Sequence, residues 1–231
     1  MLYRSFTRYW ALLHRTGIFT DLQKSLLNNR KSRVCPPLGY SRESADNAVE
    51  DLSSSWPEGI GHSRHVTRLA LQLFDALQPV HAMGGDDRYL LEYAGLLHDI
   101  GWRYGEKRHN RRGALMVTRS ENLPFDLTEC SIISLCIFLH RGGMNYPAEP
   151  LYSLLPPRDQ KRALALASLL RMGDGLDYLH NGRVRDISIT MTPGTVTVEI
   201  MGDGDCTAEK ERAKVKSDLF ASTFGLTVVI Q

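Results

Sequence analysis

One stretch of the sequence decides the fold: Leu90-Leu91-Glu92-Tyr93-Ala94-Gly95-Leu96-Leu97-His98-Asp99-Ile100-Gly101. It predicts a helix, and because apolar residues occupy nearly every face, the helix should be central and buried. We expect Asp86 or Asp87 to cap its start and Gly101 to end it in a left-handed conformation. The helix nevertheless ends in an imidazole beside a carboxylate, and burial without partners would cost on the order of 1–3 kcal/mol for each group. A divalent metal ion would satisfy both groups.

A metal site needs further ligands, and a helix predicted over residues 61–77 offers one. At 3.6 residues per turn, His62 falls inside the edge of its apolar stripe, whereas His65 falls on the polar side. His62 is therefore the better candidate, with a capping or core histidine as the alternative. Imidazole nitrogen and carboxylate oxygen suit Zn, Fe, Mn, Co or Ni, and the carboxylate also suits Mg.

Two more predicted helices end in polar groups. Asp126 and Glu129 resemble a capping box that starts an apolar helix, and this helix ends at His140. A helix opening at residue 158 leads to Asp174, which continues an apolar face and is a candidate for a metal or a salt bridge. We expect Asp177 to pair with Arg171 or with a substrate.

The segment that follows the central helix, residues 102–112, is rich in arginine. Because it comes directly after His98 and Asp99, it is suited to holding phosphate oxygens, with a solvated basic loop as the alternative. The candidate phosphate-binding residues in and beyond this segment are Arg103, Arg111, Arg112, Arg141 and Arg171.

Composition places limits on the class of protein. The chain has 231 residues, a formal net charge of +2 and 42% hydrophobic residues, so it can bury a real core and carries no nucleic-acid signature. Four scattered cysteines without a Cys-x-x-Cys pair argue against a zinc ribbon or a disulfide scaffold and favour a cytoplasmic protein. The chain contains no apolar run of the roughly 20 residues that span a bilayer.

We expect a mainly α fold in three parts. Residues 1–40 form a basic N-terminal extension, either helical or partly disordered; a targeting peptide or a surface anchor is the alternative. Residues 41–182 form a helical bundle, in which residues 144–157 are a Pro-rich loop. Residues 183–231 form a small α+β subdomain with strands at 184–190, 195–200 and 226–230, an antiparallel sheet, and a helix at 207–224 capped by Gly225.

The set His62, His98-Asp99 and Asp174 resembles the H…HD…D signature of the HD superfamily of metal-dependent phosphohydrolases. Residues 62–75, 90–101, 169–177 and 216–225 are similar to the C-terminal HD domain of the exopolyphosphatase/guanosine pentaphosphate phosphohydrolase family, over about residues 42–229. That family normally carries an actin-like ATPase-type region with its phosphatase site. The chain lacks that region, so we expect a stand-alone HD domain and do not transfer those activities.

The resemblance implies a divalent metal held by His62, His98, Asp99 and Asp174. In the related HD-GYP phosphodiesterases a histidine four residues before a glycine is a ligand, and His109 has that spacing. His109 and His140 would then hold a second metal or a phosphate; otherwise a single metal is expected.

The leading hypothesis is a phosphohydrolase that acts on a nucleotide or another phosphate ester or anhydride through metal-activated water, with Asp99 also orienting that water. Its partner would be a small phosphorylated substrate, and a homodimer is a further expectation. The alternatives are a non-catalytic metal- or nucleotide-binding regulatory module and a fold whose polar cluster is structural.

Overall fold

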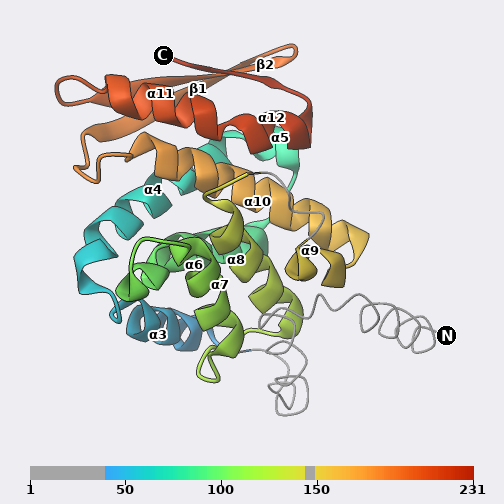
Figure 1. Ribbon diagram of the computed structural model, residues 1–231. Coiled ribbons are helices and arrows are strands. Elements are labelled where there is room, and N and C mark those ends of the chain that lie inside the picture. The colour runs from blue at the N-terminus through green and yellow to red at the C-terminus, as the bar shows by residue number, and fades with distance from the viewer. Residues whose placement is uncertain (1–39, 144–148) are drawn as a thin grey trace.

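The computed structural model describes residues 40–143 and 149–231. The predicted basic extension, its 35–39 linker and part of the predicted 144–157 loop lie outside these residues. The described part is mainly helical with a small C-terminal α+β part, which confirms the predicted fold class (Figure 1). Among the described residues, no helix combines the length and apolar character that crossing a bilayer requires.

Within the described residues, the helical body is built from six longer helices and four short ones. The longer helices are α3 (Arg42–Ser53), α4 (Ile60–Ala76), α6 (Gly85–Leu97), α7 (His109–Arg119), α8 (Leu127–Leu139) and α10 (Pro157–Leu176). The short ones are η1 (Pro57–Gly59), α5 (Gln78–His81), η2 (Ile100–Tyr104) and α9 (Pro150–Leu154). The C-terminal part contains β1 (Val184–Thr192), β2 (Thr195–Gly202), α11 (Thr207–Lys216), α12 (Asp218–Phe224) and β3 (Thr227–Ile230).

Helices α6, α8 and α10 form the core of the bundle. Helix α6 packs against α3, α4, α8 and α10, so the predicted central position of this helix is confirmed. Residues 163–176 of α10 are all buried, because α4 and α8 lie against it on the bundle side and α11 and α12 on the other. Two glycines allow this close approach: a Cβ at Gly175 would lie 2.7 Å from the Cα of Ala213, and one at Gly173 would lie 3.1 Å from the Ala70 side chain.

The predicted start of α8 agrees with the structure, whereas the predicted start of α6 does not. The capping box of α8 is present: Asp126 accepts from the N–H groups of Thr128 and Glu129, and Glu129 accepts from the N–H of Asp126. The expectation that Asp86 or Asp87 is the N-cap of α6 was wrong: the N-cap is Gly84, and Asp87, in the first turn, accepts from the N–H of Gly84 at 3.3 Å.

The expectation that Gly101 is left-handed was wrong. Helix α6 ends at Leu97, and Gly101 lies inside the 3-10 helix η2 with an ordinary φ. Glycine is required there for space, because a Cβ would collide with the carbonyl of His109 and lie 2.7 Å from the amide nitrogen of Gly113. This close approach brings η2 and the start of α7 together.

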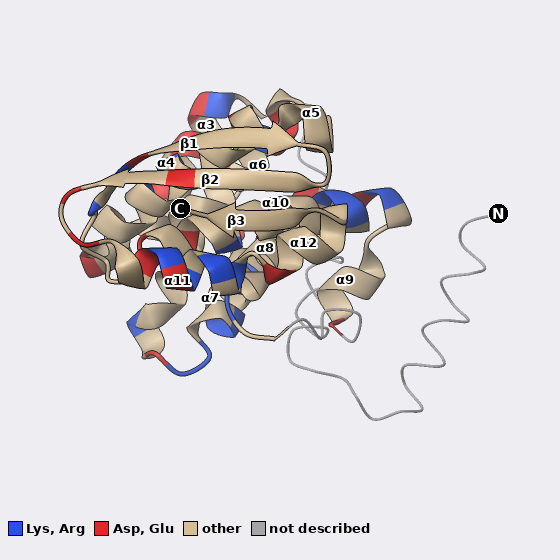
Figure 2. Ribbon diagram, turned by 90° about the horizontal axis from the view of Figure 1, so that it is seen from above, with Lys and Arg blue, Asp and Glu red and all other residues tan. Residues whose placement is uncertain are grey.

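The sheet differs from the expected antiparallel arrangement. Its order is β1-β2-β3, with β1 and β2 antiparallel but β2 and β3 parallel, and Figure 2 shows β2 between the other two. The reason is that a helical connection of sufficient length to join parallel strands separates β2 from β3. This connection is broken at Ser217 into α11 and α12, where one helix was predicted. Gly225 ends α12 in the left-handed conformation, as predicted.

The predicted division at residue 182 remains a prediction. Helices α11 and α12, which follow this residue, pack directly on α10, which precedes it.

Candidate metal centre

Six predicted residues converge on one point inside the helical body. His62 lies in the first turn of α4, His98 follows the last residue of α6, and His140 follows the last residue of α8. Asp99 comes directly after His98, His109 opens α7, and Asp174 lies near the end of α10. All six side chains are buried. Residues as far apart in the sequence as 62 and 174 are therefore brought together by the packing of α4, α6, α7, α8 and α10.

Each histidine is fixed from behind through its Nδ1 atom. Three of them meet a carbonyl oxygen three residues earlier in the chain: His98 meets Gly95 at 2.7 Å, His109 meets Glu106 at 3.0 Å, and His140 meets Ile137 at 2.6 Å. The Nδ1 of His62 meets the Asp177 carboxylate at 2.8 Å. Because these acceptors require a proton on Nδ1, each neutral ring carries its lone pair on Nε2, which is the usual outer hydrogen bonding of metal-ligating histidines.

The four Nε2 atoms point inward as two pairs. The Nε2 atoms of His62 and His98 lie 3.3 Å apart, and those of His109 and His140 lie 3.1 Å apart. Two imidazole lone pairs that face each other repel, so each pair requires a proton or a cation between its nitrogens. With metal–nitrogen bonds of 2.0–2.1 Å, two ligands at right angles or slightly wider would lie about 2.9–3.4 Å apart. Both observed separations are within this range.

Asp99 lies between the two histidine pairs. Its Oδ1 is 3.2 Å from the Nε2 of His109 and 3.6 Å from that of His140. Its Oδ2 is 3.7 Å from the Nε2 of His62 and 3.6 Å from that of His98. One carboxylate thus presents one oxygen to each pair, which is how a bridging ligand serves two ions.

Asp174 adds an oxygen to the first pair only. Its Oδ1 lies 3.5 Å from the Nε2 of His62 and 3.9 Å from that of His98. The triads His62–His98–Asp174 and His98–Asp99–His140 each have the spacing of a metal-binding group. The donor set of imidazole and carboxylate suits a first-row divalent ion, and its identity is not fixed by the ligands.

The electrostatics of the site favour the protonation states that bind metal. Burial lowers the pKa of His98 to about 4 and lowers the pKa of His140 well below its usual value, so both rings are neutral at pH 7. Burial alone would raise the pKa of Asp99, but the neighbouring His98 and His109 more than offset it and hold the Asp99 pKa below its usual value. The site therefore holds two neutral imidazoles, those of His98 and His140, beside an ionised carboxylate.

Lys216 is a functional candidate that the sequence reasoning missed. Its Nζ is in close contact with the Oδ2 of Asp174, and the two side chains are 10% and 11% exposed. Lys216 ends α11, so the C-terminal part of the chain brings an amine to this cluster, and burial lowers the pKa of this amine to about 7. The residue lies in the 216–225 segment used for the family resemblance, but no spacing rule links it to Asp174, 42 residues earlier.

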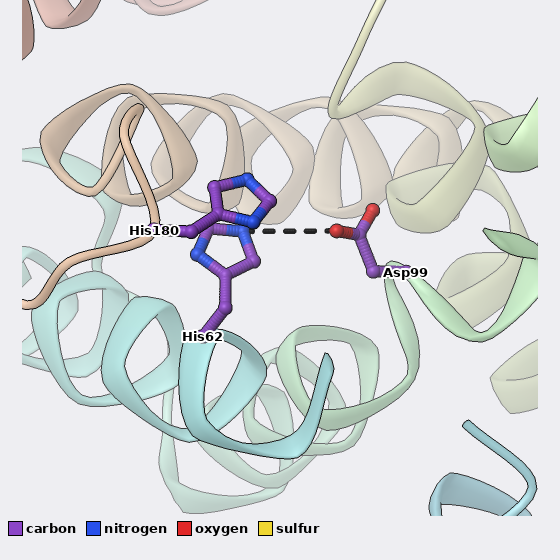
Figure 3. A group of neighbouring side chains, drawn as sticks. All are labelled: His62, Asp99 and His180. Atoms are coloured by element: carbon purple, nitrogen blue, oxygen red, sulfur yellow. Dashed lines mark ion pairs between the residues drawn. The ribbon is translucent and has the colours of Figure 1, made fainter. Parts of the chain in front are cut away.

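His180 was also missed, and it lies at the open side of the site. Its ring stacks on that of His62 with centroids 3.6 Å apart and 9° between the planes (Figure 3). His180 is exposed, and one of its ring nitrogens lies within 4.8 Å of a ligand atom of His62 and of Asp99. The sequence signal was weak, because His180 lies in a short turn after α10 outside every periodic pattern.

The expected pair of Arg171 and Asp177 is absent. Asp177 instead contacts His62, and Arg171 donates from Nε and Nη2 to Asp218 at 2.7 and 2.9 Å and from Nη1 to the Leu139 carbonyl. These contacts tie α10 to α12 and to the end of α8, and the predicted substrate contact of Arg171 stays a prediction.

The other predicted arginines differ in their distance from the centre. Arg141 is nearest, with Nη1 3.3 Å from the Nδ1 of His109 and Nη2 3.4 Å from the Oε1 of Glu106. Arg111 pairs with Glu149, Arg112 donates to the carbonyls of Tyr104 and Gly105, and Arg103 is exposed beside Tyr104.

The family model for Ppx/GppA phosphatase, domain III, matches residues 45–199. The chain belongs to this family. No curated protein matches the chain. The match to the Ppx/GppA family covers all six converging residues and ends before α11, so Lys216 lies beyond it. Membership of a phosphatase family indicates phosphohydrolase chemistry on phosphate anhydrides.

Proposed function

We propose that this Ppx/GppA-family chain is an HD-type phosphohydrolase that uses two divalent metal ions to cleave a phosphate anhydride or ester, with nucleotides among its substrates. The observation that carries the proposal is the position of Asp99 between two pairs of histidine Nε2 atoms, each ring fixed through Nδ1. A purely structural cluster would gain nothing from four lone pairs facing one another.

The donor set divides between two ions. His62, His98 and Asp174 would hold the first, His109 and His140 the second, and Asp99 would bridge them. When bound, such ions supply Lewis-acid polarisation of a phosphoryl oxygen and lower the pKa of a water molecule. Mn, Mg, Fe, Co, Ni and Zn are all compatible with nitrogen and oxygen ligands of this kind.

The residues of the chain have separate tasks in hydrolysis. The reaction adds water across a P–O bond: the water oxygen bonds to phosphorus, the bridging oxygen leaves, and the protons of water end on the phosphate product and the leaving group. Asp99 accepts a hydrogen bond from the attacking water and orients it. Arg141 supplies positive charge for the phosphoryl oxygens. Lys216 holds the outer oxygen of Asp174, so that Oδ1 faces the ions.

Metal content and turnover in matched variants test the proposal. We expect the purified protein to bind two Mn²⁺ ions per chain and to release phosphate from at least one member of a panel of polyphosphate, pyrophosphate, nucleotides and p-nitrophenyl phosphate. Asp99→Asn should lose Mn²⁺ and reduce kcat/KM by at least 10³-fold, because the bridging carboxylate serves both ions. Asp75→Asn removes an exposed carboxylate far from the centre and is the control.

Two outcomes would contradict the proposal. A protein that binds no divalent metal would leave the cluster structural. A protein that binds two ions but is inert on the whole panel would favour the non-catalytic metal- or nucleotide-binding module instead.

A further inference from the structure

We infer that His180 donates a hydrogen bond to the phosphoryl group of the substrate at the open side of the metal centre. This inference rests on the proposed function and adds a substrate-contacting residue to it. Three observations support it: the stacking of His180 on His62, the strained turn that holds it there, and its exposure.

The stacking geometry indicates what the His180 ring faces. A metal ion binds an imidazole along the in-plane lone pair of the nitrogen. Two rings that are parallel within 9° and have centroids 3.6 Å apart direct their in-plane lone pairs within two separate parallel planes, so both cannot point straight at one ion. Figure 3 shows a ring nitrogen of His180 next to the His62 nitrogen from which the ion pair to Asp99 starts. With His62 as the ligand, the lone pairs of His180 lie in the neighbouring plane and are directed to the space beside the ion. A phosphoryl oxygen bound at the centre would occupy that space.

The turn that carries His180 is held in a conformation that side chains rarely adopt. His180 has a φ of 53°, in the left-handed region, which costs roughly 1–2 kcal/mol for a residue other than glycine. Such strain persists where surrounding contacts impose it, and it is concentrated at functional sites. Here the His180 N–H donates to the Asp177 carbonyl at 2.9 Å, and the Gly182 N–H donates to Asp177 Oδ1 at 2.8 Å.

Asp177 connects this turn to the metal centre. Its Oδ1 binds the turn at Gly182, while its Oδ2 accepts from the Nδ1 of His62. One buried carboxylate therefore fixes both the orientation of a ligand and the position of the ring stacked on it. A surface histidine without a functional role would not need this connection through Asp177 to the metal centre.

The exposure of His180 separates it from the ligands. The six converging residues are all buried, whereas His180 is exposed, as are Tyr178 and Leu179 beside it. A substrate that arrives from solvent meets His180 before it reaches His62. A ring N–H directed at an anionic oxygen makes a charge-assisted hydrogen bond, which is stronger than one between neutral groups.

Inorganic phosphate is the probe for the test, because it carries the oxygens of any substrate of this class. Mn²⁺ is first titrated into the full-length wild type, His180→Ala, His180→Asn and Leu179→Ala, and phosphate is then titrated into each Mn²⁺-loaded protein by calorimetry. Leu179→Ala shortens an exposed side chain on the same turn and is the matched control. Asn tolerates the left-handed conformation and keeps an N–H donor, so His180→Asn separates the hydrogen bond from the backbone.

We expect His180→Ala to bind Mn²⁺ with the wild-type stoichiometry and to bind phosphate at least tenfold more weakly, with His180→Asn between the two and Leu179→Ala unchanged. Wild-type phosphate affinity in His180→Ala would overturn the inference and leave the proposed function intact. Loss of a Mn²⁺ ion in His180→Ala would also overturn it, since His180 would then be a ligand. A wild type that binds Mn²⁺ but shows no Mn²⁺-dependent phosphate binding would overturn the inference and the proposed function together.

Discussion

The contact between Lys216 and Asp174 predicts that a single substitution changes stability in opposite ways with and without metal. Burial lowers the pKa of Lys216 to about 7, so the comparison is made at pH 6, where the amine is charged. At this pH, the Asp174 carboxylate, 11% exposed, loses its positive partner in Lys216→Met. Removing one member of a buried ion pair costs about 3–5 kcal/mol, and we take about 3 kcal/mol because both side chains retain slight exposure. The metal-free variant should therefore be less stable than the wild type by this amount.

A bound ion should remove most of that loss, because it supplies positive charge to the same carboxylate. We expect the difference in unfolding free energy between Lys216→Met and the wild type to fall below about 1 kcal/mol at saturating Mn²⁺. By linkage, this change of about 2 kcal/mol means that the variant binds Mn²⁺ roughly 30-fold more tightly than the wild type.

The assay is urea unfolding of both proteins in EDTA and in excess Mn²⁺, with calorimetric Mn²⁺ titrations at the same pH. Lys214→Met removes an exposed lysine from the same helix and should change neither quantity, whereas Lys216→Arg keeps the charge and should lie near the wild type. An equal gain in stability from Mn²⁺ in Lys216→Met and wild type would refute the argument that Lys216 and the ion share Asp174.

Three further predictions concern other parts of the centre. Because the pKa of His98 is lowered to about 4, the unfolded chain binds more protons than the folded chain between pH 4 and 6.5. Urea titrations of the metal-free protein should therefore show lower stability at pH 5.0 than at pH 7.5, with about 2 kcal/mol of the difference from His98 alone. Stability that does not fall over this range would contradict a buried neutral His98 ring. His109→Gln should reduce bound Mn²⁺ from two ions to one, as measured by metal analysis, because His62, His98 and Asp174 remain; loss of both ions or of none would argue against two separable sites. Gly101→Ala should destabilise the chain by roughly 1–3 kcal/mol, because the added Cβ meets backbone atoms of α7. The control is Gly85→Ala, where a Cβ meets nothing within 4 Å. Equal unfolding midpoints for the two variants would refute the close approach of η2 and α7.

The part of the centre that sequence reasoning could locate is the part that interrupts an apolar pattern. His98, His140 and Asp174 stand out because each lies at or near the end of a helix whose faces are otherwise buried. Their position in the fold follows from the helix that carries them, and the structure brings all three together with His62. Their role as metal ligands remains a prediction.

The rest of the centre depends on contacts between segments that no local rule connects. Lys216 reaches Asp174 only because α11 packs on α10, and His180 reaches His62 only through a turn tied to Asp177. In the same way, Arg171 was assigned to a substrate because its partner Asp218 lies 47 residues later. Local chemistry identified charged residues but not their partners.

The same distinction between local sequence signals and contacts between distant segments applies to the fold. Strand β3 was located from its composition, but its direction depends on the crossover formed by α11 and α12, which was read as one helix. Gly101 was identified as a special position, yet for the wrong reason: the constraint is the nearby backbone of His109 and not a left-handed turn. The sequence therefore identified Gly101 as a constrained position, but the nature of the constraint depends on the packing of η2 against α7.

The end of the family match at residue 199 has a practical consequence for any shortened version of the chain. A fragment that ends there would contain all six converging residues, so a search for the motif alone would identify its centre as intact. These residues are His62, His98, Asp99, His109, His140 and Asp174. The fragment would nevertheless leave the outer side of α10 bare and Asp174 without its lysine, and Arg171 would lose the carboxylate of Asp218. The family match therefore ends at residue 199, whereas the contacts that cover α10 and pair with Asp174 and Arg171 come from α11 and α12.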